Sequence, residues 1–299
     1  MSINKNFKIL VITVASWNSK VGSNTWTSLL KDYDSENIAN ICIREEIPDS
    51  DICSRYFCIS ENKVLKSILK SNIKTGYEVM PKSQEENTDL GVHNERYKQM
   101  KKKRRYSMLL ARELVWKFGK WKTRELDKFL DSFKPDIILH AMEGYIHLNR
   151  IIQYAIKHTG AKAVGYIWDD NFTYKQHSDF GYKVYRFFQR MSLKKLASVT
   201  QEFFAITPKT KSEADEFFGI DSVLLTKPLN SVPKVSGSKP NNPLQMLYTG
   251  NLQIGRDRSL EKISKGLSEV NKDGVKIILD VYTNTYLDDK KMQKICSPF

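Results

Sequence analysis

Residues 7–14 read FKILVITV, a nearly continuous run of apolar and β-branched side chains. Such a run is typical of a strand that is covered on both faces, as in a parallel sheet. The later apolar runs that we expect to form strands lie at 38–43, 55–59, 135–140, 163–168, 203–206 and 223–226. Helical patterns separate most of these runs. The alternation predicts an α/β fold, with a doubly wound Rossmann-like N-terminal domain over residues 1–227.

The chain changes character after this domain. Residues 228–243 hold four of the nine prolines together with serine and glycine, which predicts a linker. A strand, a turn and a helix follow from Leu244, and a further strand at 275–281 precedes a last helical pattern. Residues 244–299 are therefore predicted to form the start of a C-terminal Rossmann-like unit, which is incomplete because it amounts to one βαβ unit plus a helix.

The composition narrows the class of partner. The 299 residues carry a net charge of +14, which favours a nucleotide, another polyanion or an anionic membrane surface. Cys42, Cys53, Cys58 and Cys296 show no CxxC spacing, so they fit reduced thiols better than a zinc site or a disulfide framework. The apolar run at 9–15 is too short to span a bilayer.

The turn after the strand that begins at Leu244 suggests an anion site. Gly250 and Gly255 leave this turn without side-chain bulk, and Arg256 and Arg258 follow at the start of a helix. Backbone N–H groups at a helix N-terminus attract anions, so a phosphate-bearing ligand is the first hypothesis. The alternative is an ordinary strand-to-helix turn on a basic protein.

Two other strand ends carry polar loops. Residues 15–24 read ASWNSKVGSN, and Gly22 and Ser23 are predicted to line a binding site because ligands of open α/β sheets lie beyond the carboxyl ends of strands. A simple connection is the alternative for this loop. His140 ends the strand at 135–140, and Glu143 lies in the loop that follows it. Both are therefore predicted to lie at the edge of the sheet where the strands have their carboxyl ends.

Two adjacent carboxylates, Asp169 and Asp170, follow the strand at 163–168. Carboxylates at a strand end suit proton transfer or hydrogen bonding to sugar hydroxyls. Only one of the two side chains can readily face the crevice, and we expect Asp169 to do so. The alternative is that Asp170 or Asn171 only caps the next helix.

The densest basic run, KQMKKKRR, covers residues 98–105 and leads into an apolar and aromatic helical pattern up to Trp121. Segment 98–121 is therefore predicted to be a basic amphipathic helix that contacts an anionic membrane surface. Alternatively, its apolar stripe packs on the sheet and the charges are solvated. Nucleic acid is not expected as a partner because no nucleic-acid-binding fold signature is present.

The stretch Tyr248–Leu252, together with Arg256 and Ser259–Leu260, resembles the opening of the donor-binding domain in GT-B glycosyltransferases of family 4. In bacterial surface-polysaccharide enzymes of this family, a glycine ends the strand and two cations reach the donor diphosphate. Gly250 matches that glycine, Arg256 falls at the place of the family's lysine, and Asn251 replaces its arginine.

The resemblance extends to the first domain, where Gly22 falls in the glycine-containing first loop, and His140, Glu143 and Asp169 fall at strand ends near the sugar site. It implies a GT-B-like fold and a retaining hexosyltransferase that uses a nucleotide-sugar donor and a polyprenyl-linked or saccharide acceptor, in the cleft between its domains. It also implies that no metal or cofactor is needed, and that the enzyme is cytoplasmic and peripheral on the inner face of the cell membrane.

The donor domains of this family are longer and end in a Glu-x7-Glu motif. Glu261 and Glu269 have this spacing but lie on the first predicted helix after the linker, where we expect solvent-facing charges. The chain therefore resembles a glycosyltransferase truncated in its donor domain, and the resemblance leaves two outcomes open, activity of this chain alone or a chain too short to be active. The competing hypothesis is a non-catalytic basic scaffold that docks on a membrane or a partner.

Overall fold

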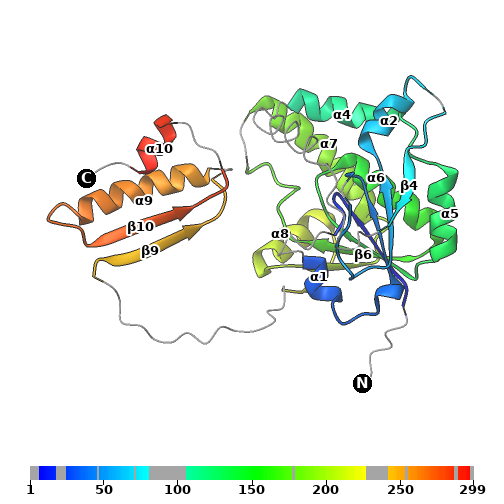
Figure 1. The fold of residues 1–299 in the computed structure, drawn as a ribbon, viewed down its shortest axis with the longest axis horizontal. Coiled ribbons are helices and arrows are strands. Elements are labelled where there is room, and N and C mark those ends of the chain that lie inside the picture. Colours follow the sequence, from blue (N-terminus) through cyan, green and yellow to red (C-terminus); the bar gives the residue numbers. More distant parts are fainter. Residues whose placement is uncertain are drawn as a thin grey trace. The chain divides into compact units, whose positions relative to one another are not determined.

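The computed structural model describes residues 7–17, 25–45, 47–70, 72–80, 106–176, 179–226, 242–252, 255–285 and 289–296. The chain divides into two compact units, unit one (residues 1–229) and unit two (residues 230–299) (Figure 1). Except for Asn242 and Pro243, the predicted linker lies outside the described residues.

Unit one is built on an eight-stranded sheet in the order β4-β3-β2-β1-β5-β6-β7-β8. All neighbouring strands pair in parallel except β3 and β4, which are antiparallel. The strands are β1 Ile9–Thr13, β2 Ile38–Cys42, β3 Arg55–Ile59, β4 Gly76–Val79, β5 Ile137–Ala141, β6 Lys162–Ile167, β7 Glu202–Ala205 and β8 Val223–Leu224. The order runs outward from β1 to β3 in one direction and from β5 to β8 in the other, so it reverses between β1 and β5.

Helices cover both faces of this sheet (Figure 1). They are α1 Thr25–Leu30, the short 3-10 helix η1 Ser35–Asn37, α2 Glu61–Ser67, α4 Tyr106–Phe118, α5 Arg124–Phe133, α6 Ile146–Thr159, α7 Phe180–Ala197 and α8 Pro208–Phe218. Leu10 and Ile138 face a core that holds side chains of α2 and of α4 to α8, whereas Val11 and Ala141 face a core that holds Trp26 of α1. The predicted α/β, doubly wound Rossmann-like class is confirmed.

Local signals in the sequence set several helix ends. Thr207 accepts a hydrogen bond from the backbone N–H of Thr210 at 3.1 Å and caps α8, with Pro208 in the first turn. Gly160 ends α6 at φ 69° and Gly219 ends α8 at φ 70°, in the left-handed region that glycine adopts without steric cost. Lys134 ends α5 in the same region, at φ 51°.

The segment around α4 differs from the prediction. Residues 98–105 lie outside the described residues, and α4 ends at Phe118, so Trp121 lies between α4 and α5 in the core. Leu114 and Phe118 of the apolar stripe face solvent, which counts against the alternative that the whole stripe packs on the sheet, while Trp116 is buried. Glycine at 119 permits the turn, since a Cβ there would lie 2.5 Å from Cγ1 of Val64.

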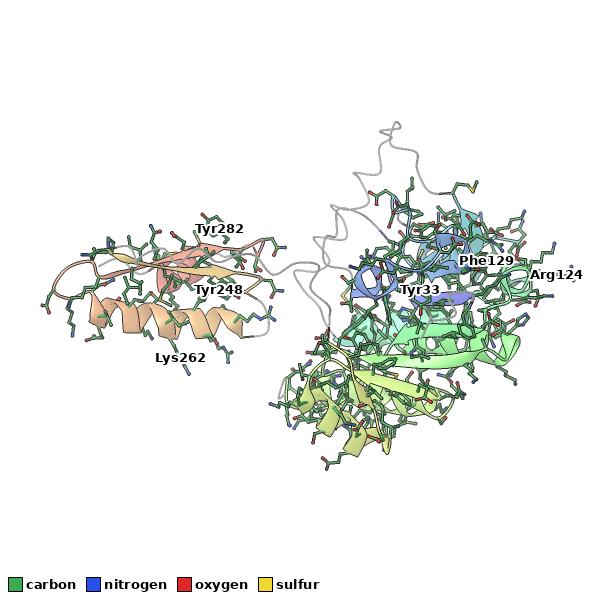
Figure 2. All side chains as sticks on the ribbon, turned by 90° about the horizontal axis from the view of Figure 1, so that it is seen from below. Tyr33, Arg124, Phe129, Tyr248, Lys262 and Tyr282 are labelled. Atoms are coloured by element: carbon green, nitrogen blue, oxygen red, sulfur yellow. The ribbon has the colours of Figure 1, made fainter. Side chains whose placement is uncertain are left out.

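Unit two consists of β9 Leu244–Thr249, α9 Arg256–Val270, β10 Ile277–Tyr282 and α10 Asp289–Ile295. The two strands pair in parallel, and a small core forms around Leu252, Leu260 and Ile295. Figure 2 shows Tyr248 between the sheet and α9, and Tyr282 on the opposite face, where 67% of its surface is exposed. This order agrees with the predicted second Rossmann-like unit.

Within the described ranges, no helix combines the length and the apolar character that a membrane span requires.

Candidate functional site

The reversal of strand order in unit one marks a candidate ligand site. In open α/β sheets, the crevice at such a switch point lies outside the carboxyl ends of the strands that flank it. Here the flanking strands are β1 and β5, followed by Ala15–Trp17 and by the loop at Met142–Gly144. Gly22 and Ser23, which the sequence predicts for this edge, lie outside the described residues.

Glu143 lies in the loop after β5, directly at this switch point, and is half-buried. Burial and, to a smaller extent, the negative charge of Asp169 raise the pKa of the carboxyl group from 4.5 to about 7, while the positive charge of Arg44 opposes both effects. A carboxyl group with a pKa near neutrality can bind and release a proton at physiological pH, which is the property of a general acid or base.

Hydrogen bonds hold the loop of Glu143 from three sides. The backbone N–H of Met142 donates to the carbonyl of Tyr166 at 2.9 Å, which extends the pairing of β5 with β6. The side chain of Asn171 donates to the carbonyl of Met142 at 3.3 Å, and the buried Gln189 donates to the carbonyl of Gly144 at 2.6 Å. The position of Glu143 is therefore set by β6, by the following loop and by α7.

Asp169 and Asp170 follow β6 and have different environments. Asp169 is exposed, and its charge contributes to the raised pKa of Glu143, so the two carboxylates lie near each other. Asp170 accepts hydrogen bonds from the backbone N–H groups of Phe172 at 3.2 Å and Thr173 at 2.8 Å, and from the hydroxyl of Thr173. Asp170 thus stabilises the turn, which leaves Asp169 as the carboxylate available for a ligand.

His140 is the fourth residue of β5, so it lies within the sheet, and its side chain is fully buried. Its Nε2 lies 3.1 Å from the hydroxyl oxygen of Thr200, and its ring packs beside Gly165, where an added Cβ would lie 3.3 Å from Cε1. Desolvation lowers the pKa of this histidine to about 4, so the ring is neutral at physiological pH. This position supports a role in packing and gives no support to contact with a substrate.

Arg44 belongs to the site although the sequence analysis did not select it. It follows β2, the neighbour of β1, and its charge lowers the pKa of Glu143, which it therefore approaches. Its carbonyl accepts hydrogen bonds from the thiols of Cys42 at 3.6 Å and Cys58 at 3.5 Å. Its position after a strand of the parallel sheet was the available signal, but basic residues are too numerous in this chain for that signal to stand out.

The second candidate site is the turn from β9 to α9 in unit two. Gly250 has φ 154° and Gly255 has φ 79°, backbone conformations that residues other than glycine rarely adopt. Helix α9 begins at Arg256 without a side-chain cap. Arg256 donates to the side-chain oxygen of Asn251 at 2.8 Å, and Arg258 is exposed in the same turn. The structure thus brings Asn251 and Arg256 together at a helix N-terminus, the geometry that attracts anions.

Further predicted features are resolved in detail. Glu261 forms an ion pair with Lys265 at 3.4 Å and Glu269 pairs with Lys272, as expected for charges on the surface of α9. Cys42, Cys53 and Cys58 are buried thiols and Cys296 is an exposed thiol. Among the residues that the structure describes, no three His, Cys, Asp or Glu side chains come together as a group that could hold a metal ion.

Comparison with known proteins gives similarity to solved structures alone. No family model and no curated protein matches the chain. Among solved structures, the S. aureus MnaA–UDP co-structure aligns with a TM-score of 0.40 and 12% sequence identity, covering 97% of this chain. The alignment spans only 65% of the other chain. A similarity with a TM-score of 0.40 gives no argument for function. The geometry of the two candidate sites is therefore the basis for the function proposed below.

Proposed function

We propose that this protein is a nucleotide-sugar-dependent glycosyltransferase that transfers a sugar to a membrane-associated acceptor, polyprenyl-linked or saccharide, in surface-polysaccharide biosynthesis. The observation that carries the proposal is Glu143, a carboxyl group with a pKa of about 7 at the switch point of a Rossmann-like sheet. Unit one binds the acceptor in this proposal, and unit two binds the donor.

On the acceptor side, Glu143 takes the proton of the attacking hydroxyl group as the new glycosidic bond forms. Asp169 holds the acceptor hydroxyl groups by hydrogen bonds, since it is exposed beside Glu143 while Asp170 is engaged in its turn. Arg44 keeps part of the Glu143 population ionised, and hence able to act as a base, by lowering its pKa. His140 has only a packing role in this proposal, beside Gly165 of β6.

On the donor side, the diphosphate lies at the N-terminus of α9. The backbone N–H groups of the first turn and the guanidinium groups of Arg256 and Arg258 stabilise the negative charge of the leaving group. In the proposed metal-independent reaction, this arrangement supplies positive charge without a divalent ion. Retention of configuration enters the proposal from the family resemblance. Asn251 fixes Arg256 through the 2.8 Å hydrogen bond and contributes an amide in place of a second cation.

Membrane association is part of the proposal. Segment 98–121 is basic in its first half, and its described part, α4 and the residues up to Trp121, exposes Leu114, Lys117 and Phe118. Such a segment holds an enzyme at the inner, anionic face of the cell membrane, where a lipid-linked acceptor is found.

Calorimetric titration with UDP and GDP tests the donor half. We expect a Kd of about 10⁻⁶–10⁻⁴ M for one of them, and the Arg256→Ala variant should weaken binding by about 10-fold or more, because a charge-assisted hydrogen bond contributes about 1.5–3 kcal/mol. Lys262→Ala is the matched control, since Lys262 lies on the same helix and points away from the sheet (Figure 2).

The acceptor half is tested by sugar transfer from radiolabelled donor to lipid extract. Glu143→Gln should reduce the rate by about 100-fold or more, as expected for loss of a general base. Glu202→Gln, at the exposed start of β7 and thus at the opposite edge of the sheet, should leave the rate unchanged. An unchanged rate in Glu143→Gln would remove the carboxyl group from the mechanism.

The second candidate function is a non-catalytic basic scaffold that docks on a membrane or a partner. The replacement of the family's arginine by Asn251 favours it, because the described turn then has fewer cations for a diphosphate. Absence of binding to any nucleoside diphosphate, with membrane binding intact, would support this function over the transferase.

A further inference from the structure

Helix α7 exposes a stripe of large apolar side chains although it buries several polar ones. Its buried face holds Arg186, Gln189 and Ser192 beside the apolar Leu193 and Leu196. Its outward stripe instead holds large apolar side chains, with exposed fractions of 81% for Phe180 and 52% for Phe187, and with Phe188 and Met191 also exposed. Soluble proteins rarely expose a contiguous apolar patch of this kind without a partner for it.

The buried polar side chains fix this orientation. Arg186 donates to the hydroxyl of Tyr182 at 3.1 Å and to the side chain of Gln176 at 2.9 Å. Gln189 donates to the carbonyl of Gly144, and the hydroxyl of Ser192 accepts a hydrogen bond from the side chain of Asn149 at 3.1 Å. Rotating α7 to bury its phenylalanines would break the hydrogen bonds to Gln176, Gly144 and Asn149 and would take Leu193 and Leu196 out of the core, so the outward aromatic stripe is the stable arrangement.

The same stripe is basic and contains no acid. Lys183, Lys194 and Lys195 are exposed along it, and no Asp or Glu occurs between Phe180 and Ala197. An apolar hollow of about 540 Å³ lies on this side of α7, lined by Tyr174, Lys183, Val184, Phe187 and Phe188. The partner must therefore offer both an apolar phase and negative charge.

The geometry points to an anionic lipid bilayer as the occupant of this face. We propose that Phe180, Phe187, Phe188 and Met191 enter the boundary between headgroups and acyl chains, while Lys183 and Lys195 contact lipid phosphates. A helix with large apolar residues flanked by lysines has the pattern of an interfacial membrane helix. A second copy of this chain would place lysines against lysines with no acid on the stripe to compensate, which disfavours self-association.

The residues of this surface lie outside segment 98–121 in the sequence, and the surface does not depend on the proposed glycosyl transfer. It is linked to the candidate site in unit one through Gln189, which holds the loop of Glu143. Docking by α7 would therefore place that loop near the lipid surface. Because vesicle binding is measured without nucleotide or sugar, its outcome is separate from that of the transferase assays.

The experiment is flotation of the full chain with vesicles of phosphatidylcholine alone or with about one-third phosphatidylglycerol. The wild-type chain should bind the anionic vesicles and release at high salt. The double variant Phe187→Ser/Phe188→Ser should lower the partition coefficient by at least about 10-fold, because two apolar rings no longer leave water on binding. Lys183→Gln/Lys195→Gln should lower it by about 10-fold or more on anionic vesicles.

Matched controls use exposed residues of unit one outside α7. Phe7→Ser removes an exposed aromatic ring before β1, and Lys157→Gln/Lys162→Gln removes two exposed lysines near the start of β6. Both should bind vesicles as the wild-type chain does. Circular dichroism confirms that each variant is folded, which is expected because every substituted side chain is exposed.

Several results would overturn the proposal. One is unchanged vesicle binding by the phenylalanine variant, or binding that disappears only when the basic residues at 101–105 are neutralised. Another is the absence of wild-type binding to anionic vesicles. If vesicles are not bound, two other results would reassign the surface. Binding of single-stranded RNA that depends on the same lysines would assign it to nucleic acid. A dimer in sedimentation that the phenylalanine substitutions dissociate would assign it to a second copy of this chain.

Discussion

Replacing Glu143 by glutamine should make unfolding respond differently to pH. In the folded chain the pKa of Glu143 is raised from 4.5 to about 7, so the folded state holds a proton that the unfolded state has already released between these values. The free energy of unfolding therefore falls as pH rises from 4.5 to about 7, because at higher pH the folded state must bury a carboxylate. Glutamine resembles the protonated acid and does not titrate, so the variant lacks this loss.

The magnitude follows from the two pKa values. Each pKa unit corresponds to about 1.4 kcal/mol, so a rise from 4.5 to about 7 corresponds to about 3 kcal/mol. The free energy of unfolding of Glu143→Gln minus that of the wild-type chain should thus increase by about 3 kcal/mol between pH 4.5 and pH 8. Other titrating groups are common to both proteins and cancel in this difference.

The assay is urea unfolding of both proteins at half-unit pH steps, followed by fluorescence of the tryptophans in unit one. Glu202→Gln, an exposed change, should give a flat difference. A flat difference for Glu143→Gln would mean that the site is too solvated to perturb the carboxyl group. A difference that falls with pH would mean that Arg44 dominates and holds the pKa of Glu143 below its usual value.

Four further changes test the packing around the site and the ends of two helices. His140→Gln should give the opposite slope, because a pKa lowered from 6.5 to about 4 makes the wild-type chain lose stability as pH falls through that window, and urea unfolding at pH 4–7 measures it. Gly144→Ala places a Cβ 2.4 Å from Nε2 of Gln189, so it should cost about 1–2 kcal/mol through the broken hydrogen bond, and Gln189→Ala should make the added cost small in a double-mutant cycle. Gly160→Ala has space but φ 69° and should cost about 1 kcal/mol from the backbone alone, in the same unfolding assay. Lys134→Gly should raise the melting temperature, since glycine relieves the left-handed φ of 51° by up to about 1 kcal/mol.

The sheet was predictable because its strands are buried on both faces. The nearly continuous apolar run at 7–14 and the short run at 137–139 are read directly from the sequence, and Gly160 and Gly219 stand where α6 and α8 end, a usual place for glycine. β4 was not predicted because GYEV is short, lies at the sheet edge and shows no apolar run. Its pairing with β3 is a long-range property that local pattern does not contain.

The site was less predictable than the fold. Strand ends identified Glu143 and Asp169, but the pKa of Glu143 depends on burial and on Arg44, which comes from a strand on the far side of β1. His140 has the residue type of a catalytic group, and only the hydrogen bond to Thr200 and its burial reveal a packing role. On α4 and α7, apolar residues occur on both sides, so periodicity alone did not identify which phenylalanines face water.

The small sheet of unit two has a consequence for how a ligand would act on it. In the described residues β9 pairs only with β10, so each strand has one edge without a strand partner there, whereas β1 pairs with a strand on both sides. A lone two-stranded pair is marginal by itself, and this unit should open locally more often than the large sheet. An anion bound at the start of α9 would favour the closed form by mass action, so occupancy and order in this unit would rise together.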